Sequence, residues 1–232
     1  RNYSVTYGWA IYKEGERQMG GGFIIHRCRF DNYTGLNTGG AIMLKDPSRY
    51  IELRNCSFDG NKSMGSGGAI FYESYFGEGF LLADSCIFMN NRGGGGGAFA
   101  FLSTQWGNED SDGFTFYFSN NQFNNNRTPN ARGGAINFSN LGSKSRNYII
   151  GCNFTQNWSL NGGSGVYLYN APHADGVLYV QYSKFIGNEA PYLGRFGGIL
   201  VQGHLASSHS MKSRLEVYNT VFARNDGAVA GD

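Results

Sequence analysis

A tetrapeptide of the form Phe-x-x-Asn recurs through the sequence at nearly constant intervals. The repeats contain six strict copies. The first and last residues of each copy are Phe58 and Asn61, Phe88 and Asn91, Phe123 and Asn126, Phe154 and Asn157, Phe185 and Asn188, and Phe222 and Asn225. A degenerate copy begins at Phe30, with Tyr33 in place of the Asn. Successive Phe residues lie 28, 30, 35, 31, 31 and 37 positions apart. A period of this length predicts a repeat protein in which each unit stacks on the next.

A second motif, Gly-Gly-Ala followed by an aliphatic or aromatic residue, alternates with the first. Strict copies begin at Gly39, Gly67, Gly96 and Gly133, and weaker copies begin at Ser164 and Gly197. Paired Gly residues let the backbone turn tightly where no side chain fits. Each pair therefore predicts a corner packed closely against the neighbouring repeat.

The residues around these motifs alternate between apolar and polar types, which predicts strands with one buried face. Apolar residues stand seven and five positions before the Phe, as at Ile51 and Leu53, and the alternation then slips by one residue. A bend is needed there to keep the same face inward, and Asn55 or Gly151 at this point suits a left-handed corner. The predicted fold is all-β: a right-handed parallel β-helix of about seven coils with three strands per coil.

In such a helix, equivalent residues of successive coils lie above one another, so one coil cannot bury its own apolar face. We expect the Phe residues of the six strict repeats to form one interior stack. We expect the Asn residues that end the repeats to form a ladder beside it, with each amide bonded to the backbone or to the next amide.

Length and charge limit the classes of function. The 232 residues predict one elongated domain over 1–232, a segment of a longer repeat protein. The formal charge is +2 and no basic cluster stands out in the sequence, so we expect no nucleic-acid partner. No apolar run approaches the roughly 20 residues of a membrane span, so we expect no membrane insertion by this segment.

The alternating Phe-x-x-Asn and Gly-Gly-Ala-Ile motifs resemble the polymorphic outer membrane protein repeats of chlamydial surface proteins, which also occur in some eukaryotic surface proteins. The resemblance covers residues 8–232. It implies a surface-exposed, adhesive β-helix with an extracellular or cell-surface location. The membrane barrel of the bacterial family is not found in this sequence.

The four Cys residues share one repeat position, two before the Phe, and we interpret them as small apolar residues of an inward column. A disulfide between Cys28 and Cys56, or between Cys56 and Cys86, remains an alternative because neighbouring coils lie within bonding reach. Cys152 lies two coils from Cys86, so we expect a free thiol there. No His shares the column and no Cys-x-x-Cys motif occurs, so we expect no metal site.

No set of catalytic residues can be assigned from the sequence. Residues 108–113 resemble the start of a calcium loop, but Ser119 stands where that loop needs an acidic residue, so we prefer a solvated loop. Enzymes on β-helices usually cleave polysaccharides with clustered carboxylates. Here Glu14, Lys45 and Glu73 share one repeat position with alternating sign, which suits a surface charge ladder. We therefore predict no catalytic residues, no cofactor and a protein that is not an enzyme.

Two sets of outward residues remain as candidate sites. Tyr12, Met43, Phe71, Tyr167 and Leu200 share one outward position and predict either an interface stripe or an apolar strip covered by the chain's own loops. Among the Asn-x-Ser/Thr sequons, those at Asn153, Asn32 and Asn2 are our candidates for N-glycosylation. Those at Asn61, Asn126 and Asn157 are needed in the ladder, and the corner position argues against Asn55.

The function that we predict is a non-catalytic extracellular or cell-surface protein with a structural or adhesive role. Its expected partners are cell-surface glycans or proteins, or neighbouring copies in an assembly. The alternatives are a carbohydrate-active β-helix enzyme, such as a polysaccharide lyase or hydrolase, and a subunit of an extracellular filament.

Overall fold

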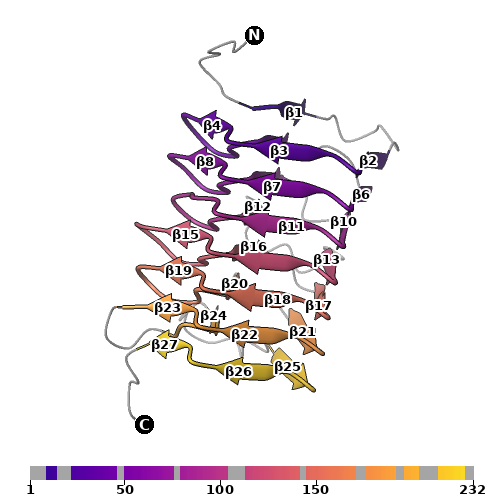
Figure 1. Ribbon diagram of the computed structural model, residues 1–232. Coiled ribbons are helices and arrows are strands. Elements are labelled where there is room, and N and C mark those ends of the chain that lie inside the picture. Colours follow the sequence, from indigo (N-terminus) through magenta and orange to yellow (C-terminus); the bar gives the residue numbers. More distant parts are fainter. Residues whose placement is uncertain are drawn as a thin grey trace.

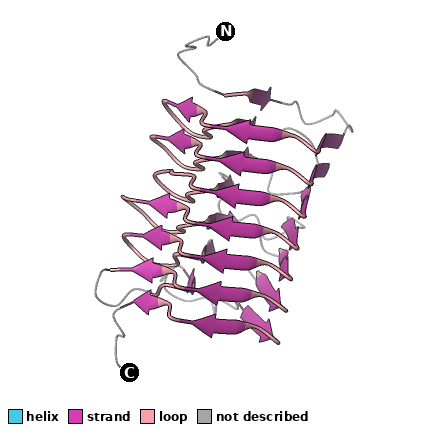
Figure 2. Cartoon of the chain, viewed as in Figure 1, coloured by secondary structure: helices cyan, strands magenta, loops and turns pink. Residues whose placement is uncertain are grey.

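The structure is a computed structural model that describes residues 9–14, 22–45, 50–75, 79–103, 113–141, 145–170, 176–191, 196–203 and 214–227. These residues form strands and no helix, and equivalent strands of successive repeats stack in parallel (Figure 1). Figure 2 shows the same stack coloured by secondary structure. The predicted all-β parallel solenoid is confirmed.

The described residues form three long sheets of seven strands each, named A, B and C here. Sheet A consists of β1 (Ile11–Glu14), β5 (Ile42–Lys45), β9 (Ile70–Ser74), β12 (Phe99–Ser103), β16 (Ile136–Leu141), β20 (Val166–Asn170) and β24 (Ile199–Gly203). Sheet B consists of β2 (Gly22–His26), β6 (Tyr50–Arg54), β10 (Gly79–Asp84), β13 (Phe114–Ser119), β17 (Arg146–Ile150), β21 (Val177–Gln181) and β25 (Arg214–Tyr218). Sheet C consists of β3 (Arg29–Asp31), β7 (Ser57–Asp59), β11 (Ile87–Met89), β14 (Gln122–Asn124), β18 (Asn153–Thr155), β22 (Lys184–Ile186) and β26 (Val221–Ala223).

Two details differ from the prediction. Among the described residues, six turns contain a strand of each of the three long sheets. These turns start at β2, β6, β10, β13, β17 and β21, and they are flanked by β1 and by β25 to β27. Most turns also contain a fourth, two-residue strand between sheets C and A: β4 (Thr34–Gly35), β8 (Lys62–Ser63), β15 (Arg127–Thr128), β19 (Trp158–Ser159), β23 (Glu189–Ala190) and β27 (Asp226–Gly227). We call this layer the short-strand corner. A two-residue segment is too short to show a hydrophobic period, so the pattern could not reveal it.

A left-handed residue forms the corner between sheets B and C in every turn. It stands three positions before the Phe, and its φ lies between 46° and 63° at Arg27, Asn55, Ser85, Asn120, Gly151, Tyr182 and Asn219. This conformation turns the chain while keeping the apolar residues on both sides of the corner inward, which explains the slip in the alternation.

The Gly pairs form a further corner before sheet A. The first Gly is left-handed, with φ of 70° at Gly67 and 63° at Gly96. The second Gly lies against the next turn, so that a Cβ on Gly68 would overlap the carbonyl oxygen of Gly97. Neighbouring turns can therefore keep their spacing only if this position has no side chain.

The repeated Phe side chains form a continuous interior stack. Ring centroids of successive residues from Phe30 to Phe222 lie 4.5–5.0 Å apart with interplanar angles of 2–12°. The rings from Phe58 to Phe185 are fully buried, whereas Phe222 is 47% exposed. Leu215 and Val217, which the pattern also places inward, are 38% and 41% exposed. These three residues lie in the last described turn, where no described strand covers their outer side.

The Asn side chains form a ladder beside the Phe stack. Nδ2 of Asn126 donates to the carbonyl oxygen of Phe88 and to Oδ1 of Asn157, both at 3.0 Å. Its Oδ1 accepts bonds from the backbone N and from Nδ2 of Asn91, at 3.1 and 3.0 Å. The same four-bond pattern recurs at Asn91, Asn157 and Asn188. Each of these amides is buried and uses its full hydrogen-bonding capacity.

Replacing one ladder amide should weaken the whole solenoid. In Asn126→Ala, the buried groups of Phe88, Asn91 and Asn157 lose partners that water cannot replace, so we expect a loss of about 2–4 kcal/mol in the free energy of unfolding. Urea unfolding followed by circular dichroism measures this loss. The matched control is Gln122→Ala, an exposed residue of β14, which should change the stability by less than about 0.5 kcal/mol. Equal stability of the two variants would contradict the structural role of the ladder.

Candidate functional site

The column that contains the Cys residues is a second hydrogen-bond ladder. Sγ of Cys56 lies 3.4 Å from the carbonyl oxygen of Ile25 in the preceding turn, and Sγ of Cys152 lies 3.5 Å from that of Phe118. Asn121 replaces Cys in one turn, and its Nδ2 donates to the carbonyl oxygen of Ala83 at 2.8 Å. Ser183 and Thr220 make the equivalent contacts with Ile149 and Val180.

The interpretation of the Cys residues as small residues of an inward column is confirmed for Cys56, Cys86 and Cys152, which are buried in the apolar core, whereas Cys28 is exposed. The Cys residues share a position with Asn, Ser and Thr because that position needs a small hydrogen-bond donor. All four Cys residues are free thiols, with Cys28 exposed and the other three buried. Burial raises the pKa of Cys152 to about 12, so this thiol stays protonated and able to donate. The column is therefore structural.

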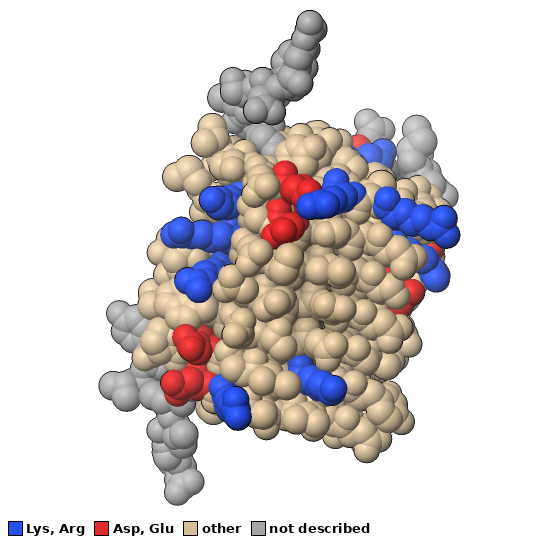
Figure 3. Space-filling model, viewed as in Figure 1, with Lys and Arg blue, Asp and Glu red and all other residues tan. Residues whose placement is uncertain are grey.

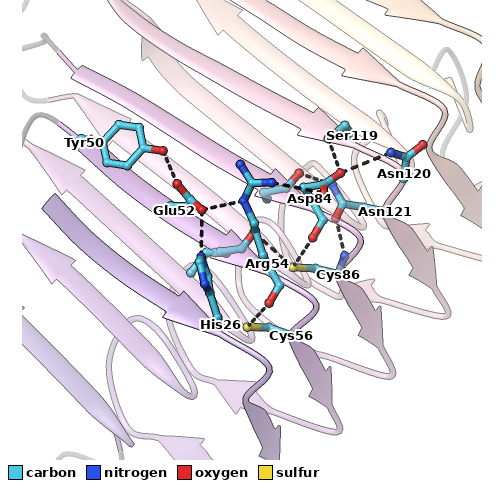
Figure 4. Close-up of polar contacts among 12 residues, drawn as sticks. His26, Tyr50, Glu52, Arg54, Cys56, Asp84, Cys86, Ser119, Asn120 and Asn121 are labelled. Atoms are coloured by element: carbon cyan, nitrogen blue, oxygen red, sulfur yellow. Dashed lines mark hydrogen bonds and ion pairs between the residues drawn. The ribbon is translucent and has the colours of Figure 1, made fainter.

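A polar cluster lies on the outer face of sheet B near its first strands (Figure 4). Glu52 of β6 is at its centre, with Oε1 at 2.8 Å from Nε2 of His26 and at 2.5 Å from Nε of Arg54. The hydroxyl of Tyr50 donates to Oε2. Arg54 also lies 4.0 Å from the carboxylate of Asp84 in the next turn. The cluster thus joins three successive turns through their side chains.

The second carboxylate of the cluster is also held by neutral donors. Oδ1 of Asp84 accepts bonds from Oγ of Ser119 at 2.6 Å and from Nδ2 of Asn120 at 3.2 Å. Both donors belong to the following turn, so Asp84 extends the cluster along the axis of the solenoid.

The hydrogen-bond donors around Glu52 set the pKa of this carboxylate. The hydrogen bond from Tyr50, followed by those from His26 and Arg54, lowers the pKa of Glu52 to about 2 against the opposing effect of burial. A carboxylate with so low a pKa is a weak base and is not available as a general acid at neutral pH. The cluster is therefore suited to holding charges together between turns rather than to the acid–base chemistry of polysaccharide cleavage.

The predicted outward stripe on sheet A is mostly covered. Met43, Phe71 and Tyr167 are only 7%, 5% and 4% exposed, whereas Tyr12 is 47% exposed. Met43 and Phe71 belong to a small apolar cluster with Ala100, Trp9 and Leu102. The fifth member of the stripe, Leu200, is half-buried. The stripe is thus not an open apolar surface, and cover by the chain itself accounts for it.

A polar groove of about 570 Å³ lies on the outer face of sheet A in the C-terminal half. Its lining residues are Asn130, Ala131, Arg132, Asn137, Ser139, Asn161, Tyr167, Tyr169 and Gln202. Nη1 of Arg132 donates to the hydroxyl of Tyr167 at 2.6 Å, and that hydroxyl lies 3.1 Å from Oε1 of Gln202. The guanidinium also lies over the Tyr167 ring, 5.1 Å from its centroid. These contacts hold a row of aromatic, amide and cationic groups in fixed positions.

Six of the sequons fall into two structural groups, and a further one, at Asn137 of β16, is half-buried. Asn153 and Asn32 are exposed, in β18 and in the turn after β3, and Asn55 is exposed as well despite its corner position. Asn61, Asn126 and Asn157 are fully buried in the ladder. Asn2 lies outside the described residues, as does most of the loop at 108–113.

The structure brings together basic residues that look dispersed in the sequence. Lys62, Arg92 and Arg127 are 30 and 35 residues apart, yet they pair in register along the short-strand corner. Their common position, directly after the Asn of each repeat, is a signal that could have revealed them. In the described part of the chain, no group of three or more His, Cys, Asp and Glu side chains is placed to hold a metal ion.

The fold defines a parallel β-solenoid, and one of its repeats matches a known family. Residues 55–73, from the sheet B–C corner through β7 and β8 into β9, match the family model described as the Chlamydia polymorphic membrane protein (Chlamydia_PMP) repeat. The resemblance to this repeat is confirmed. Searches of curated proteins and of solved structures found no match. Among the described residues, no helix could cross a membrane.

The low pKa of Glu52 predicts a pH-dependent stability. Its folded pKa of about 2 lies below the ordinary value of 4.5, so its contribution is complete above that value and is lost as the pH falls toward 2. We expect Glu52→Gln to cost about 1 kcal/mol at neutral pH, because His26 and Arg54 are partly exposed. Unfolding curves over this pH range should show the difference shrinking in acid. Glu189→Gln, an exposed control, should show no such trend, and a difference that grows in acid would contradict the assignment.

The buried and exposed sequons predict where sugar can be attached. When the chain is secreted from eukaryotic cells, we expect glycans at Asn153 and Asn32 in the folded fraction and not at Asn61, Asn126 or Asn157. Both Nδ2 protons of Asn126 and Asn157 are used in the ladder, and a glycan would replace one of them. Intact-glycopeptide mass spectrometry measures the occupancy at each site. Sugar found mainly at ladder positions of folded protein would be incompatible with this structure.

Proposed function

We propose that this protein is a non-catalytic shaft of a cell-surface protein, and that it adheres to partners through its side faces. The observation that carries the proposal is the match of residues 55–73 to the Chlamydia polymorphic membrane protein repeat, within a solenoid whose turns from Asn61 to Asn225 share one amide ladder. Because the Asn and Phe columns fix every turn, residues on the outside are held in straight rows along the axis. Such rows suit a protein that presents contact surfaces.

The absence of catalysis is supported by the chemistry of Glu52. Its donors hold this carboxylate ionised, and Asp84 beside it is engaged with Ser119 and Asn120. An inverting or retaining glycosidase needs one carboxyl group that can donate a proton. The adhesive role is supported by the groove on sheet A, where Tyr169, Asn137 and Gln202 offer the mixed aromatic and polar lining typical of ligand sites.

The proposal is tested on intact cells of the source and with purified protein. An antibody against the folded solenoid should label unpermeabilised cells, and the purified protein should bind partner cells. Asn137→Ala with Gln202→Ala, in the groove, should weaken this binding several-fold, while Gln122→Ala on sheet C should leave it unchanged. The wild type should release no sugar from acidic and neutral polysaccharides. Label confined to the cell interior, or cleavage that disappears in Glu52→Gln, would refute the proposal.

A further inference from the structure

A single row of side chains runs along the short-strand corner from one end of the solenoid to the other. Parallel pairing places its members in register in the order Thr34, Lys62, Arg92, Arg127, Trp158, Glu189 and Asp226. Figure 3 shows Lys and Arg side chains gathered over this edge near β8 and β15, and acidic side chains near β23 and β27. The row is thus basic in one half and acidic in the other, with one Trp between.

The three cations are held in an unfavourable arrangement. Successive turns rise by ~4.8 Å, so Lys62, Arg92 and Arg127 stand one above the other at about this spacing. Like charges directly opposite one another on neighbouring strands are destabilising. All three side chains are exposed, and none has an ion-pair partner among the described residues. Their charges contribute nothing to the buried ladders and are open to an external anion.

The groups beside the cations are those that bind sugars. Trp158 follows Arg127 in the row and is half-buried, so part of its ring is available for stacking. A row of exposed amides runs next to the cations: Asn125 donates to Asn90 at 2.7 Å, and Asn90 donates to Asp59 at 2.9 Å. Amides arranged in this way can exchange hydrogen bonds with hydroxyl groups.

We propose that Lys62, Arg92, Arg127 and Trp158 form a binding site for a linear acidic glycan. Carboxylate or sulfate groups of the glycan pair with the three cations, and a sugar ring packs on Trp158. This inference rests on the proposed surface location, where such glycans are met, and the site is separate from the groove on sheet A.

The row also limits the length and class of the ligand. Beyond Trp158 it continues with Glu189 and Asp226, which repel a longer polyanion. From Lys62 to Trp158 there are three steps of ~4.8 Å, or ~14 Å in all. Tight binding to nucleic acid draws on many phosphate contacts spread along a strand or duplex. Three cations in one line next to an aromatic ring favour a short acidic saccharide segment instead.

The test compares two triple variants that lose the same charge. One is Lys62→Gln, Arg92→Gln, Arg127→Gln, and the other, as control, is Arg27→Gln, Lys184→Gln, Arg224→Gln, whose cations are exposed elsewhere. The probes are a heparin oligosaccharide, an oligogalacturonate, neutral dextran and single-stranded DNA, and binding is followed by the fluorescence of the native protein. The oligosaccharide arms separate sulfate from carboxylate recognition.

We expect at least one acidic glycan to bind the wild type and the control variant with Kd values within twofold. The row variant should bind at least tenfold more weakly, and its affinity should depend less steeply on salt. Trp158→Ala should weaken binding without changing the salt dependence. In low salt, Arg92→Gln should melt at or above the wild-type temperature, because the variant relieves repulsion.

Four outcomes would overturn the inference. Three of them are the lack of binding to either acidic glycan, equal binding by the two triple variants, and DNA binding through the row that is as tight as glycan binding. The fourth is a dimer, held by Arg–Glu pairs between rows and seen as a change in mass on light scattering, that excludes the glycan. None of these results bears on the location of the protein, which the antibody test on intact cells decides.

Discussion

The structure depends on the hydrogen-bonding capacity of one side chain, the Asn amide that ends each repeat. An amide has two donor protons and two acceptor positions, and Asn126 uses all four with groups of the turns on either side. It can do so only when three successive turns are in register. A shift of one residue would leave buried polar groups without partners in every turn that it touches. The amide ladder therefore fixes the register, and the Phe stack and sheet pairing follow that register.

At other repeat positions, the residue types that occur depend on whether the position needs a hydrogen-bond donor, a left-handed backbone or free space. The position two before the Phe accepts Cys, Asn, Ser or Thr because each can donate to the carbonyl oxygen below. The corner three before the Phe accepts even Arg27 and Tyr182, because its side chain points to solvent and only its left-handed backbone matters. The second Gly of the pair accepts no side chain, because the next turn occupies that space. Conservation within the repeat thus follows donor capacity, backbone conformation and free volume.

The interior could be predicted from the sequence, and the exterior only in part. Every interior column repeats a local pattern, so the spacing of Phe58, Asn61 and Gly67 was enough to place strands, corners and the core. Outward positions depend on what else lies above them. Met43 and Phe71 looked exposed by their alternation but are covered, and the row of Lys62, Arg92 and Arg127 forms only when residues 30 and 35 apart are stacked. The sequence did not point to Glu52: Arg54 stands two positions along the same strand, but His26 meets Glu52 only when the preceding turn is stacked beside it.

The row on the short-strand corner divides one edge of the solenoid into a basic part and an acidic part. Lys62, Arg92 and Arg127 lie toward the N-terminal end, and Glu189 and Asp226 lie toward the other end, although the formal charge of the whole chain is only +2. The field of this edge acts on an approaching charged ligand over about one Debye length, or roughly 8 Å in physiological salt. An anionic ligand is drawn to the part of the edge between β8 and β15 and is repelled from the part at β23 and β27. The place at which a ligand first meets this edge is therefore set by the order of the turns, before any specific contact is made.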